Sequence, residues 1–521
     1  MQKLDQKIEE NFDVAIIGAG NGGLVAATQL ALEGKKIILF EQHNLPGGFA
    51  TSFVRGRFEF EASLHELCDY GPESNKGGIR TLFEEIGIDI PVAKVPEAYR
   101  LILTDPNEKL DVIVPFGKEE YINHIVEEVP ESEKSVRDFV GLCQEVHEAL
   151  NYIRGSRGNP DKKVLMKQYG NFLRTAAYSL DDILDSLEIP IKAQKIIKGY
   201  WVYLAIPTSR INFTIYAAML YFFLIRGAYI PLYRSSGYTM ALEKRIRDLG
   251  GRIEFNTKVE KILVENGKVI GLETSKGDKI NTNYIISNAS PTLVYNQLLY
   301  PKSERPEIGY KYTNARRHAV SCFVVYLGLN KSAEELGLKE YSYIISDNMV
   351  TEEIYDSFKN LECPKVQATI CLNNTIPDCS PKGTCILIIT SFFRPEAWEN
   401  VKKSEYFTYK DKIAKELIQK FERATKTNLS DYIEEMEVAT PETYARYTGT
   451  YKGVTYGYEV DSWDSIMPRL MSMDEERFID GLKICGGFSF QGVSYTNSLL
   501  SGQITAFLTL QEFMIEGDNN D

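Results

Sequence analysis

The pattern of apolar and polar segments near the start of the chain predicts a strand, a helix and a second strand. Residues 13–18, DVAIIG, form a short apolar run ending in glycine, as expected for a parallel strand buried on both faces. Residues 21–34, NGGLVAATQLALEG, have a helical pattern, and residues 36–41, KIILFE, form a second apolar run. This succession predicts an α/β fold that opens with a Rossmann-like unit.

The turn between the first strand and the helix matches the dinucleotide-binding pattern G-x-G-x-x-G. Gly18 allows a tight turn, Gly20 lets the backbone approach a pyrophosphate, and Gly23 lets the helix pack closely on the strand. Glu41, at the end of the second strand, stands where a ribose hydroxyl is bound, and a carboxylate there disfavours NADP. The cofactor-binding residues predicted in this region are Gly18, Ala19, Gly20, Asn21, Gly22, Gly23, Glu41 and Gln42.

A glycine pair, Gly47 and Gly48, follows the second strand and distinguishes between cofactors. NAD-dependent dehydrogenases do not usually have glycines here, whereas flavoproteins do, because their chain passes close to the pyrophosphate a second time. At this point the sequence resembles the FAD-dependent superfamily that contains the amine oxidases and the phytoene desaturases. The resemblance implies that the cofactor is FAD and that Gly47 and Gly48 contribute to its site.

Beyond residue 77 the chain alternates helical and strand-like patterns without a linker or a repeat. Helices are predicted at 119–153 and at 179–190, where Ser179 is the expected N-cap and Pro190 the stop. Residues 252–274 alternate as β-strands, with hairpin turns at ENGK and SKGD. The later predicted elements are buried strands at 318–330 and 383–393 and an amphipathic helix at 410–424.

The resemblance continues through the rest of the chain. It is carried by Val259, whose counterpart in the family meets the adenine through its backbone, by the segment 439–459, and by Gly486 and Gly487. In the family this last glycine turn, with a helix starting near Tyr495, lies under the flavin ring. The group that this chain resembles most is that of bacterial phytoene desaturases, carotenoid isomerases and retinol saturases.

The resemblance implies two domains. A Rossmann-like FAD-binding domain is expected from three separated segments, and an α+β substrate domain with a mixed sheet and helices from the remainder. The predicted ranges are 1–100, 233–299 and 475–521 for FAD binding and 101–232 and 300–474 for the substrate.

Two places depart from the family pattern. Glu61 replaces the usual aspartate and Ser63 the usual glycine, and Gln491-Gly492 followed by Ser494 replaces a Pro-Gly segment with a further glycine. Both places are expected near the contact of flavin and substrate, so the departures distinguish this chain from the usual carotenoid enzymes.

Few side chains are candidates for chemistry, because in flavoproteins the cofactor carries the hydride. His65 is the first candidate for a proton donor or base, and Tyr495 is a candidate to face the flavin; for both, plain packing is the alternative. Cys68 and Cys485 are expected to be inert buried thiols. Glu59 and Glu61 are expected to be a solvated pair.

Composition excludes several classes of protein. The net charge of −13 argues against a nucleic-acid partner, which needs a basic patch. The eight cysteines show no Cys-x-x-Cys spacing and the five histidines do not cluster with them, so we expect reduced thiols and no metal site. The polar start of the chain does not resemble a signal peptide, and a cytoplasmic protein is predicted.

The longest apolar run, residues 211–225, bears on both membrane contact and substrate. At roughly 1.5 Å per residue it covers about 22 Å, short of the roughly 30 Å of a bilayer core. A buried helix is the expected structure, and a helix that lies peripherally on a membrane surface is the alternative. The aromatic stretch 221–233 is the predicted apolar wall of a substrate cavity, with a plain core helix as the alternative.

These expectations converge on an FAD-dependent enzyme that desaturates or saturates C–C double bonds of a long apolar lipid, such as a polyene, an isoprenoid or an unsaturated fatty acid. The alternatives are a reduced-FAD-dependent double-bond isomerase without net redox chemistry, an amine oxidase relative, and a flavin-bearing binding protein without turnover. The chain has no second G-x-G-x-x-G, so a pyridine nucleotide would bind transiently or not take part. Nothing in the sequence indicates the oligomeric state.

Overall fold

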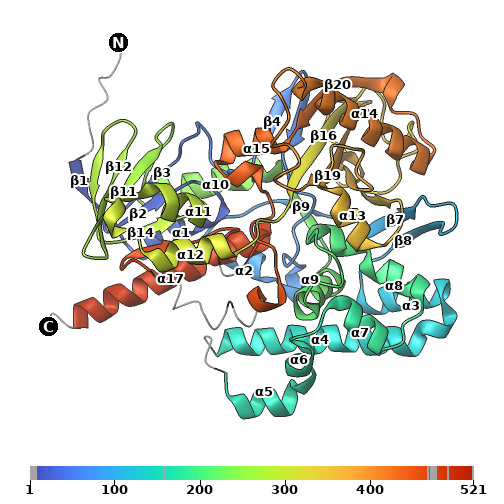
Figure 1. The fold of residues 1–521 in the computed structure, drawn as a ribbon, viewed down its shortest axis with the longest axis horizontal. Coiled ribbons are helices and arrows are strands. Elements are labelled where there is room, and N and C mark those ends of the chain that lie inside the picture. Colours follow the sequence, from blue (N-terminus) through green and yellow to red (C-terminus); the bar gives the residue numbers. More distant parts are fainter. Residues whose placement is uncertain (1–8, 157–159, 466–468, 470–477, 490–491, 519–521) are drawn as a thin grey trace.

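The structure is a computed structural model that describes residues 9–156, 160–465, 469, 478–489 and 492–518 (Figure 1). On one side of the molecule lies a five-stranded sheet in which each pair of neighbouring strands is parallel. In spatial order its strands are β10 (Arg252–Glu254), β3 (Ile37–Phe40), β2 (Val14–Ile17), β14 (Ile285–Ser287) and β21 (Leu482–Ile484). Three distant parts of the sequence therefore build one sheet.

Helices cover this parallel sheet. Helix α1 (Asn21–Leu32) is buried almost throughout and packs against α10 (Arg234–Asp248) and α17 (Tyr495–Asp518). The predicted succession of strand, glycine turn, helix and strand is thereby confirmed. In Figure 1, α17 extends away from the molecule toward the C-terminus.

A second, mixed sheet packs beside the first. Its order is β1 (Glu9–Asn11), β13 (Lys279–Asn281), β12 (Lys268–Thr274), β11 (Val259–Glu265) and β15 (Leu299–Tyr300). The hairpin predicted at ENGK joins β11 to β12, with positive φ angles of 53° at Asn266 and 75° at Gly267. Asn-Gly accommodates such angles at little cost, which is why the sequence pattern located this turn.

A seven-stranded sheet occupies the other side of the molecule (Figure 1). Its order is β20 (Ile433–Ala439), β16 (Ser321–Leu329), β19 (Cys385–Phe393), β18 (Val366–Cys371), β17 (Ser342–Ser346), β7 (Tyr99–Leu103) and β8 (Leu110–Val114). The predicted helix at 410–424 is α14 (Tyr406–Thr425), whose apolar face packs on one side of this sheet. Two short ribbons pair β4 (Ser52–Arg55) with β5 (Phe58–Glu61) and β6 (Val92–Lys94) with β9 (Tyr229–Pro231).

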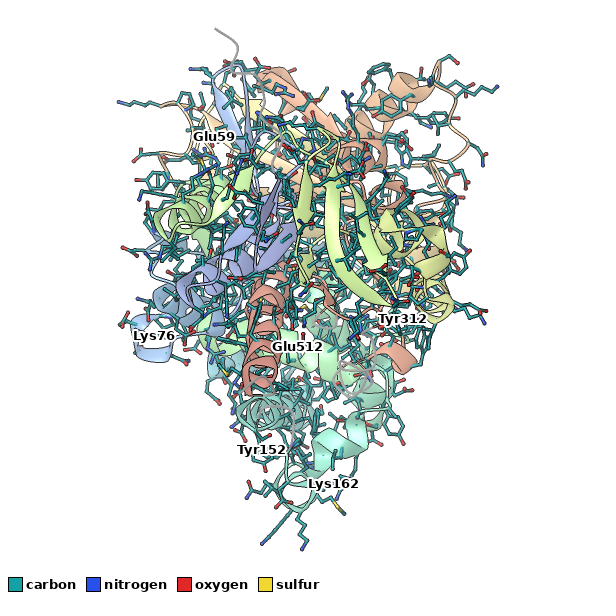
Figure 2. All side chains as sticks on the ribbon, turned by 90° about the vertical axis from the view of Figure 1, so that its left-hand side faces the viewer. Glu59, Lys76, Tyr152, Lys162, Tyr312 and Glu512 are labelled. Atoms are coloured by element: carbon teal, nitrogen blue, oxygen red, sulfur yellow. The ribbon has the colours of Figure 1, made fainter. Side chains whose placement is uncertain are left out.

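Helices form the third part of the molecule, and Figure 2 places Tyr152 and Lys162 at its far end. They are α3 (Lys118–Glu128), α4 (Glu133–Gly155), α5 (Lys162–Gln168), α6 (Gly170–Thr175), α7 (Leu180–Ser186), α8 (Ile191–Ile197) and α9 (Phe213–Arg226). The single helix expected over 119–153 is interrupted at Pro130, which has no N–H to continue the hydrogen-bond ladder. Ser179 caps α7 as predicted, through a reciprocal hydrogen-bonded box with Asp182.

The remaining α-helices of the part of the chain that the structure describes are short. They are α2 (Gly78–Glu85), α11 (Pro291–Leu293), α12 (Glu307–Ala315), α13 (Thr351–Ser357) and α15 (Pro441–Thr448).

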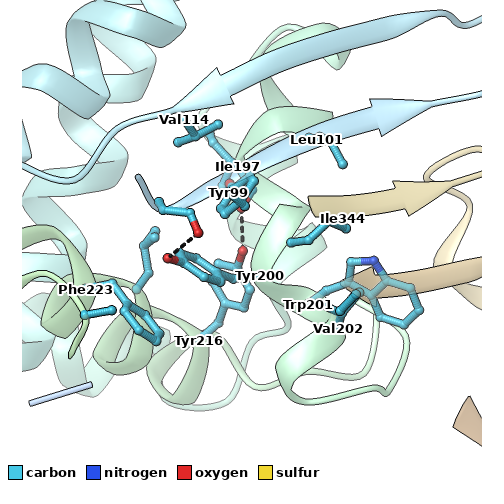
Figure 3. Close-up of a cluster of buried hydrophobic side chains, with 14 of the residues drawn as sticks. Tyr99, Leu101, Val114, Ile197, Tyr200, Trp201, Val202, Tyr216, Phe223 and Ile344 are labelled. Atoms are coloured by element: carbon cyan, nitrogen blue, oxygen red, sulfur yellow. Dashed lines mark hydrogen bonds between the residues drawn. The ribbon is translucent and has the colours of Figure 1, made fainter. Parts of the chain in front are cut away.

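Helix α9, the longest apolar run, is buried in the core of the helical part. Figure 3 shows this core, where the Tyr216 hydroxyl on α9 donates to the carbonyl of Ile197 and Phe223 lies beside Tyr200. Among the described residues, no helix combines the length and the apolar character needed to cross a membrane. The α/β fold class, with several mixed sheets and helices around a Rossmann-like unit, is confirmed.

Candidate functional site

A cavity of about 1330 Å³ lies between the parallel sheet and the seven-stranded sheet. Cavities for one small ligand usually measure roughly 300–1,000 Å³, so this one has room for a dinucleotide and a second ligand. The predicted site residues that line it are Gly18, Gly20, Asn21, Glu41, Gln42, Gly47, Gly48, His65, Val259, Gly487 and Tyr495. Ala19, Gly22, Gly23 and Gly486 do not line it and lie behind its wall.

The two glycine turns of the opening segment touch each other at one end of the cavity. Gly20 and Gly47 pair as an isolated parallel bridge, and the Gly47 amide donates to the carbonyl of Ala19 at 2.7 Å. The Glu41 carboxylate accepts from the Ala19 amide at 2.7 Å, which holds it beside the turn. These bonds hold both glycine turns and the Glu41 carboxylate at one end of the cavity, next to the start of α1. A helix start beside glycine turns and a carboxylate is the arrangement typical of pyrophosphate and ribose sites.

The glycines behind the wall are there because neighbouring backbone leaves no room for a side chain. A Cβ on Gly22 would lie 2.7 Å from the Gly486 nitrogen, and one on Gly23 would lie 2.0 Å from the Gly18 carbonyl oxygen. The two helix-start turns of the chain, after β2 and after β21, are therefore in direct contact. Asn288 packs between them and also lines the cavity, although sequence reasoning did not include it among the site residues.

Tyr495, at the start of α17, is tied to the segment where the chain departs from the family. Its hydroxyl donates to the Phe49 carbonyl at 2.9 Å and lies 2.8 Å from the Ser63 hydroxyl. A glycine at position 63 could not make this contact. Gly492 and Ser494 also line the cavity, whereas Gln491 lies outside the described residues.

The prediction that Glu59 and Glu61 are both solvated is wrong for Glu61. Its side chain is fully buried and accepts from the Ser235 amide at 2.7 Å, the Ser235 hydroxyl at 2.8 Å and the Leu64 amide at 3.2 Å. Burial raises the pKa of Glu61 to about 7, and the hydrogen bonds from Ser235 oppose that shift. Glu59 does remain partly exposed and forms an ion pair with Arg234 at 3.2 Å.

His65 lies in the cavity wall with its ring Nε2 2.9 Å from the Thr390 hydroxyl on β19. The ring of Tyr203 approaches it edge-on, with centroids 6.2 Å apart. Burial lowers the pKa of His65 to about 4, so the imidazole is neutral at neutral pH.

The neighbouring Glu66 is a cavity residue that the sequence reasoning missed. The Tyr203 hydroxyl donates to its Oε1 at 3.0 Å, while Oε2 is buried without a hydrogen-bond partner among the described residues. Burial raises the pKa of Glu66 to about 8, and the nearby Glu97 adds to the shift. A glutamate in a polar stretch gives no sequence signal of burial, because the groups that bury it come from elsewhere in the chain.

One end of the cavity is apolar. Helix α9 turns one face toward it, and β16 and α4 complete the wall. The lining residues of this end are Leu150, Ile153, Leu204, Ile215, Ala218, Met219, Phe222, Phe223, Cys322 and Val324. Of the stretch 221–233 that was expected to form an apolar wall, only Phe222 and Phe223 take part. The rest of the wall comes from earlier turns of α9, from Leu204, and from α4 and β16.

Cys68 and Cys485 are not reactive thiols. Burial raises the pKa of Cys68 to about 12 and also that of Cys485, so both are protonated and inert. Within the described ranges, His, Cys, Asp and Glu side chains form no group of three or more that could hold a metal ion.

Comparison with known proteins agrees with this arrangement. Residues 16–84 match the family model of the NAD(P)-binding Rossmann-like domain. The chloroplastic prolycopene isomerase of Daucus carota is 25% identical, over 96% of this chain and 81% of that protein. The all-trans-retinol 13,14-reductase of Danio rerio is 25% identical, over 87% of this chain and 79% of that protein.

Solved structures share the fold. An oxidoreductase from Methanosarcina mazei has a TM-score of 0.62 at 15% identity, covering 95% of this chain and 99% of its own. Putrescine oxidase bound to putrescine has a TM-score of 0.63 at 13% identity, covering 96% and 99%.

The Rossmann-like unit and these relatives imply a flavin cofactor, and the relatives are enzymes, as is this chain. Over most of its length the chain is therefore similar in sequence to a carotenoid isomerase and a retinol reductase, and it shares its fold with solved oxidoreductases such as putrescine oxidase.

Proposed function

We propose that the protein binds FAD and acts on C–C double bonds of a long apolar polyene lipid, desaturating or saturating it. The observation that carries this proposal is the continuity of the cavity, in which the dinucleotide-binding turns and the apolar face of α9 line one space. A bound flavin would accept or supply the hydride, and the protein would position the lipid and exclude water. The relatives act on prolycopene and on all-trans-retinol, both of which are polyenes.

In this proposal each group of residues has one task. The turn from Gly18 to Gly23 and the pair Gly47 and Gly48 hold the pyrophosphate, and Glu41 and Gln42 hold the ribose and its surroundings. Val259 meets the adenine, and the turn at Gly486 and Gly487 with the start of α17 supports the flavin ring. The cavity lining supports these assignments for all but Ala19, Gly22, Gly23 and Gly486, whose part is to let the backbones pack.

His65 and Tyr495 are proposed to act where cofactor and lipid meet. Tyr495 shares the Phe49 carbonyl with Ser63, which fixes its hydroxyl at the start of α17. Neutral His65 can pass a proton only through hydrogen bonds, such as the one it makes with Thr390. Both residues orient groups at the contact between the cofactor end and the apolar end of the cavity.

A double-bond isomerase that needs reduced FAD is the second candidate. Its specific support is that prolycopene isomerase matches this chain over 96% of its length. Amine oxidation has weaker support, because putrescine oxidase shares the fold at only 13% identity. The apolar lining of the α9 end also does not favour a small charged amine.

The test starts from the purified protein. Its visible spectrum should show bound oxidised flavin, which photoreduction should bleach. The oxidised and the reduced holoenzyme would each be incubated anaerobically with polyenes and unsaturated fatty acids, and the products weighed. Products lighter or heavier by two hydrogens support desaturation or saturation, and products of unchanged mass formed only with reduced flavin support the isomerase. Absence of bound flavin would overturn the proposal.

A further inference from the structure

Glu66 differs from two nearby carboxyls, Glu61 and Glu97, in the number of hydrogen bonds that it accepts. Glu61 accepts three hydrogen bonds from Ser235 and Leu64, and Glu97 accepts from the amides of Tyr341 and Ser342 at 2.6 and 3.0 Å. The hydrogen bonds of Glu61 and Glu97 thus connect segments that are far apart in the sequence. Glu66 makes one hydrogen bond, from Tyr203, and its second oxygen has no partner among the described residues.

The single partner of Glu66 is rigidly placed. Tyr203 ends the 3₁₀ helix Lys198–Tyr203, which the core in Figure 3 anchors through buried Tyr200, Trp201 and Val202. The Tyr200 ring stacks on Phe223 of α9 with centroids 4.5 Å apart, and Phe223 lines the same cavity. Glu66 and Tyr203 therefore form a fixed polar pair beside the apolar wall.

The unused hydrogen-bond donor of this pair suits an oxygen acceptor on a ligand. A neutral carboxyl that accepts from Tyr203 through Oε1 keeps one O–H donor that nothing in the described structure takes. Glu66 lines the cavity, so a ligand there lies next to this carboxyl. A buried donor without an acceptor is unfavourable, so a ligand that supplies an acceptor binds better than one that does not.

We infer that Glu66 and Tyr203 form a polar subsite that selects a polyene carrying an alcohol or carbonyl oxygen over a pure hydrocarbon of the same length and shape. The inference rests on the proposed function and narrows its substrate class. A hydrocarbon in the same cavity leaves the second carboxyl oxygen of Glu66 without a partner among the described residues. Sites built around a substrate hydroxyl strongly reject analogues that lack it. The subsite would therefore distinguish an alcohol such as all-trans-retinol from a hydrocarbon such as prolycopene, the compounds on which the two relatives act.

The test compares two ligands on the holoenzyme with oxidised flavin. They are all-trans-retinol and the hydrocarbon in which hydrogen replaces its hydroxyl, so that the chromophore, length and shape are matched. Equilibrium binding is read from the polyene fluorescence. The alcohol is expected to bind about ten- to a hundredfold more tightly. In Glu66→Leu this ratio should fall to within about threefold, whereas Glu66→Gln, which keeps hydrogen-bonding groups, should retain most of it.

The matched control is Glu131→Gln, an exposed glutamate on the 3₁₀ helix Pro130–Ser132, for which the ratio should equal that of the unmodified protein. If Glu66→Leu fails to fold, Tyr203→Phe takes its place, because it removes the hydroxyl that donates to Glu66 and should also lower the ratio. A structural role alone would weaken both ligands equally and leave the ratio unchanged.

The outcomes separate the inference from the proposed function. If the hydrocarbon binds as tightly as the alcohol, or if the preference for the alcohol survives in Glu66→Leu, the subsite is overturned while a polyene enzyme remains. If neither ligand binds a flavin-loaded protein, the proposed function fails and the subsite fails with it.

Discussion

At the residue scale, burial raises the pKa values of three carboxyls, one of which, Glu66, lines the cavity. The other two are Glu61 and Glu97. Desolvation disfavours the charged form of each, and only hydrogen bonds from neighbouring amides and hydroxyls oppose it. Protons held in the folded chain but not in the unfolded one make stability depend on pH.

The contribution of Glu66 to the free energy of unfolding should fall as the pH rises. Its pKa moves from 4.5 to about 8 on folding, so between these pH values the unfolded chain has lost a proton that the folded chain keeps. The stabilisation is complete below about pH 4.5 and is lost as the pH passes through 8. Urea titrations at pH 5, 6.5 and 8 measure the free energy of unfolding. Relative to that of the unmodified protein, the value for Glu66→Gln should rise by about 1–3 kcal/mol between pH 5 and pH 8. Glu131→Gln should show no such trend, and a constant difference for Glu66→Gln would contradict the assignment.

Gly23→Ala tests the packing of the nucleotide turn. A Cβ at this position would meet the Gly18 carbonyl oxygen at 2.0 Å, which is backbone and must move with the turn. Flavin bound per protein, measured from the visible spectrum after purification, should fall about tenfold or more, because displaced amides no longer match the pyrophosphate. Gly141→Ala in α4, where a Cβ meets nothing within 4 Å, should leave the flavin content unchanged. Full flavin content in Gly23→Ala would show that the turn tolerates the shift.

At the scale of elements, α9 is both a core helix and the wall of the cavity. Its Tyr216 and Leu220 are buried in the helical core, whereas Met219 and Phe222 line the space next to the nucleotide turns. A helix buried on all sides shows no amphipathic stripe, so the sequence could not reveal which of its faces meets the ligand.

Met219→Trp should fill the apolar end of the cavity without touching the nucleotide end. Binding of all-trans-retinol, followed by its fluorescence, should weaken about tenfold or more, while the flavin content stays within about twofold, because the larger ring takes the volume that the lipid needs. Met166→Trp on α5, where Met166 is 72% exposed, is the control of equal size and should change neither quantity. Equal loss of flavin and lipid in Met219→Trp would instead indicate general damage to the fold.

The elements that the sequence predicted are those fixed by nearby residues. The opening strand, turn and helix, the hairpin at Asn266-Gly267 and the capped helix after Ser179 each depend on a few consecutive positions. The pairing of β7 with β17 was not predictable, because it joins segments about 240 residues apart that carry no complementary pattern. The burial of Glu61 and Glu66 was missed for the same reason: Ser235 and Tyr203, which contact them, lie far along the chain.

At the scale of the whole molecule, the candidate cofactor site connects parts of the chain that are far apart. The parallel sheet takes strands from residues 14–40, 252–287 and 482–484, and the turns at their ends line one cavity. A cofactor bound there would contact every part of the nucleotide unit at once.

Flavin binding should therefore slow amide hydrogen exchange in several separate segments together. Mass-resolved exchange on the flavin-free and flavin-loaded protein should show protection at 18–23, 257–259, 288–290, 486–488 and 492–495, since these segments line or support the cavity. Helix α14, on the far side of the seven-stranded sheet, should exchange equally in both forms. Protection confined to 18–23 would contradict a site assembled from all these segments.

The hydrogen bond from Tyr495 to Phe49 has a consequence for how the protein is made. The two residues are 446 positions apart, so at roughly 5–20 residues per second a ribosome needs about 20–90 s to deliver the second after the first. During that time the opening turn has emerged, but the helix start that completes its far side does not yet exist. A cofactor that needs both segments can therefore be bound only after Tyr495 has emerged, and until then the apolar walls of the cavity lack part of their covering.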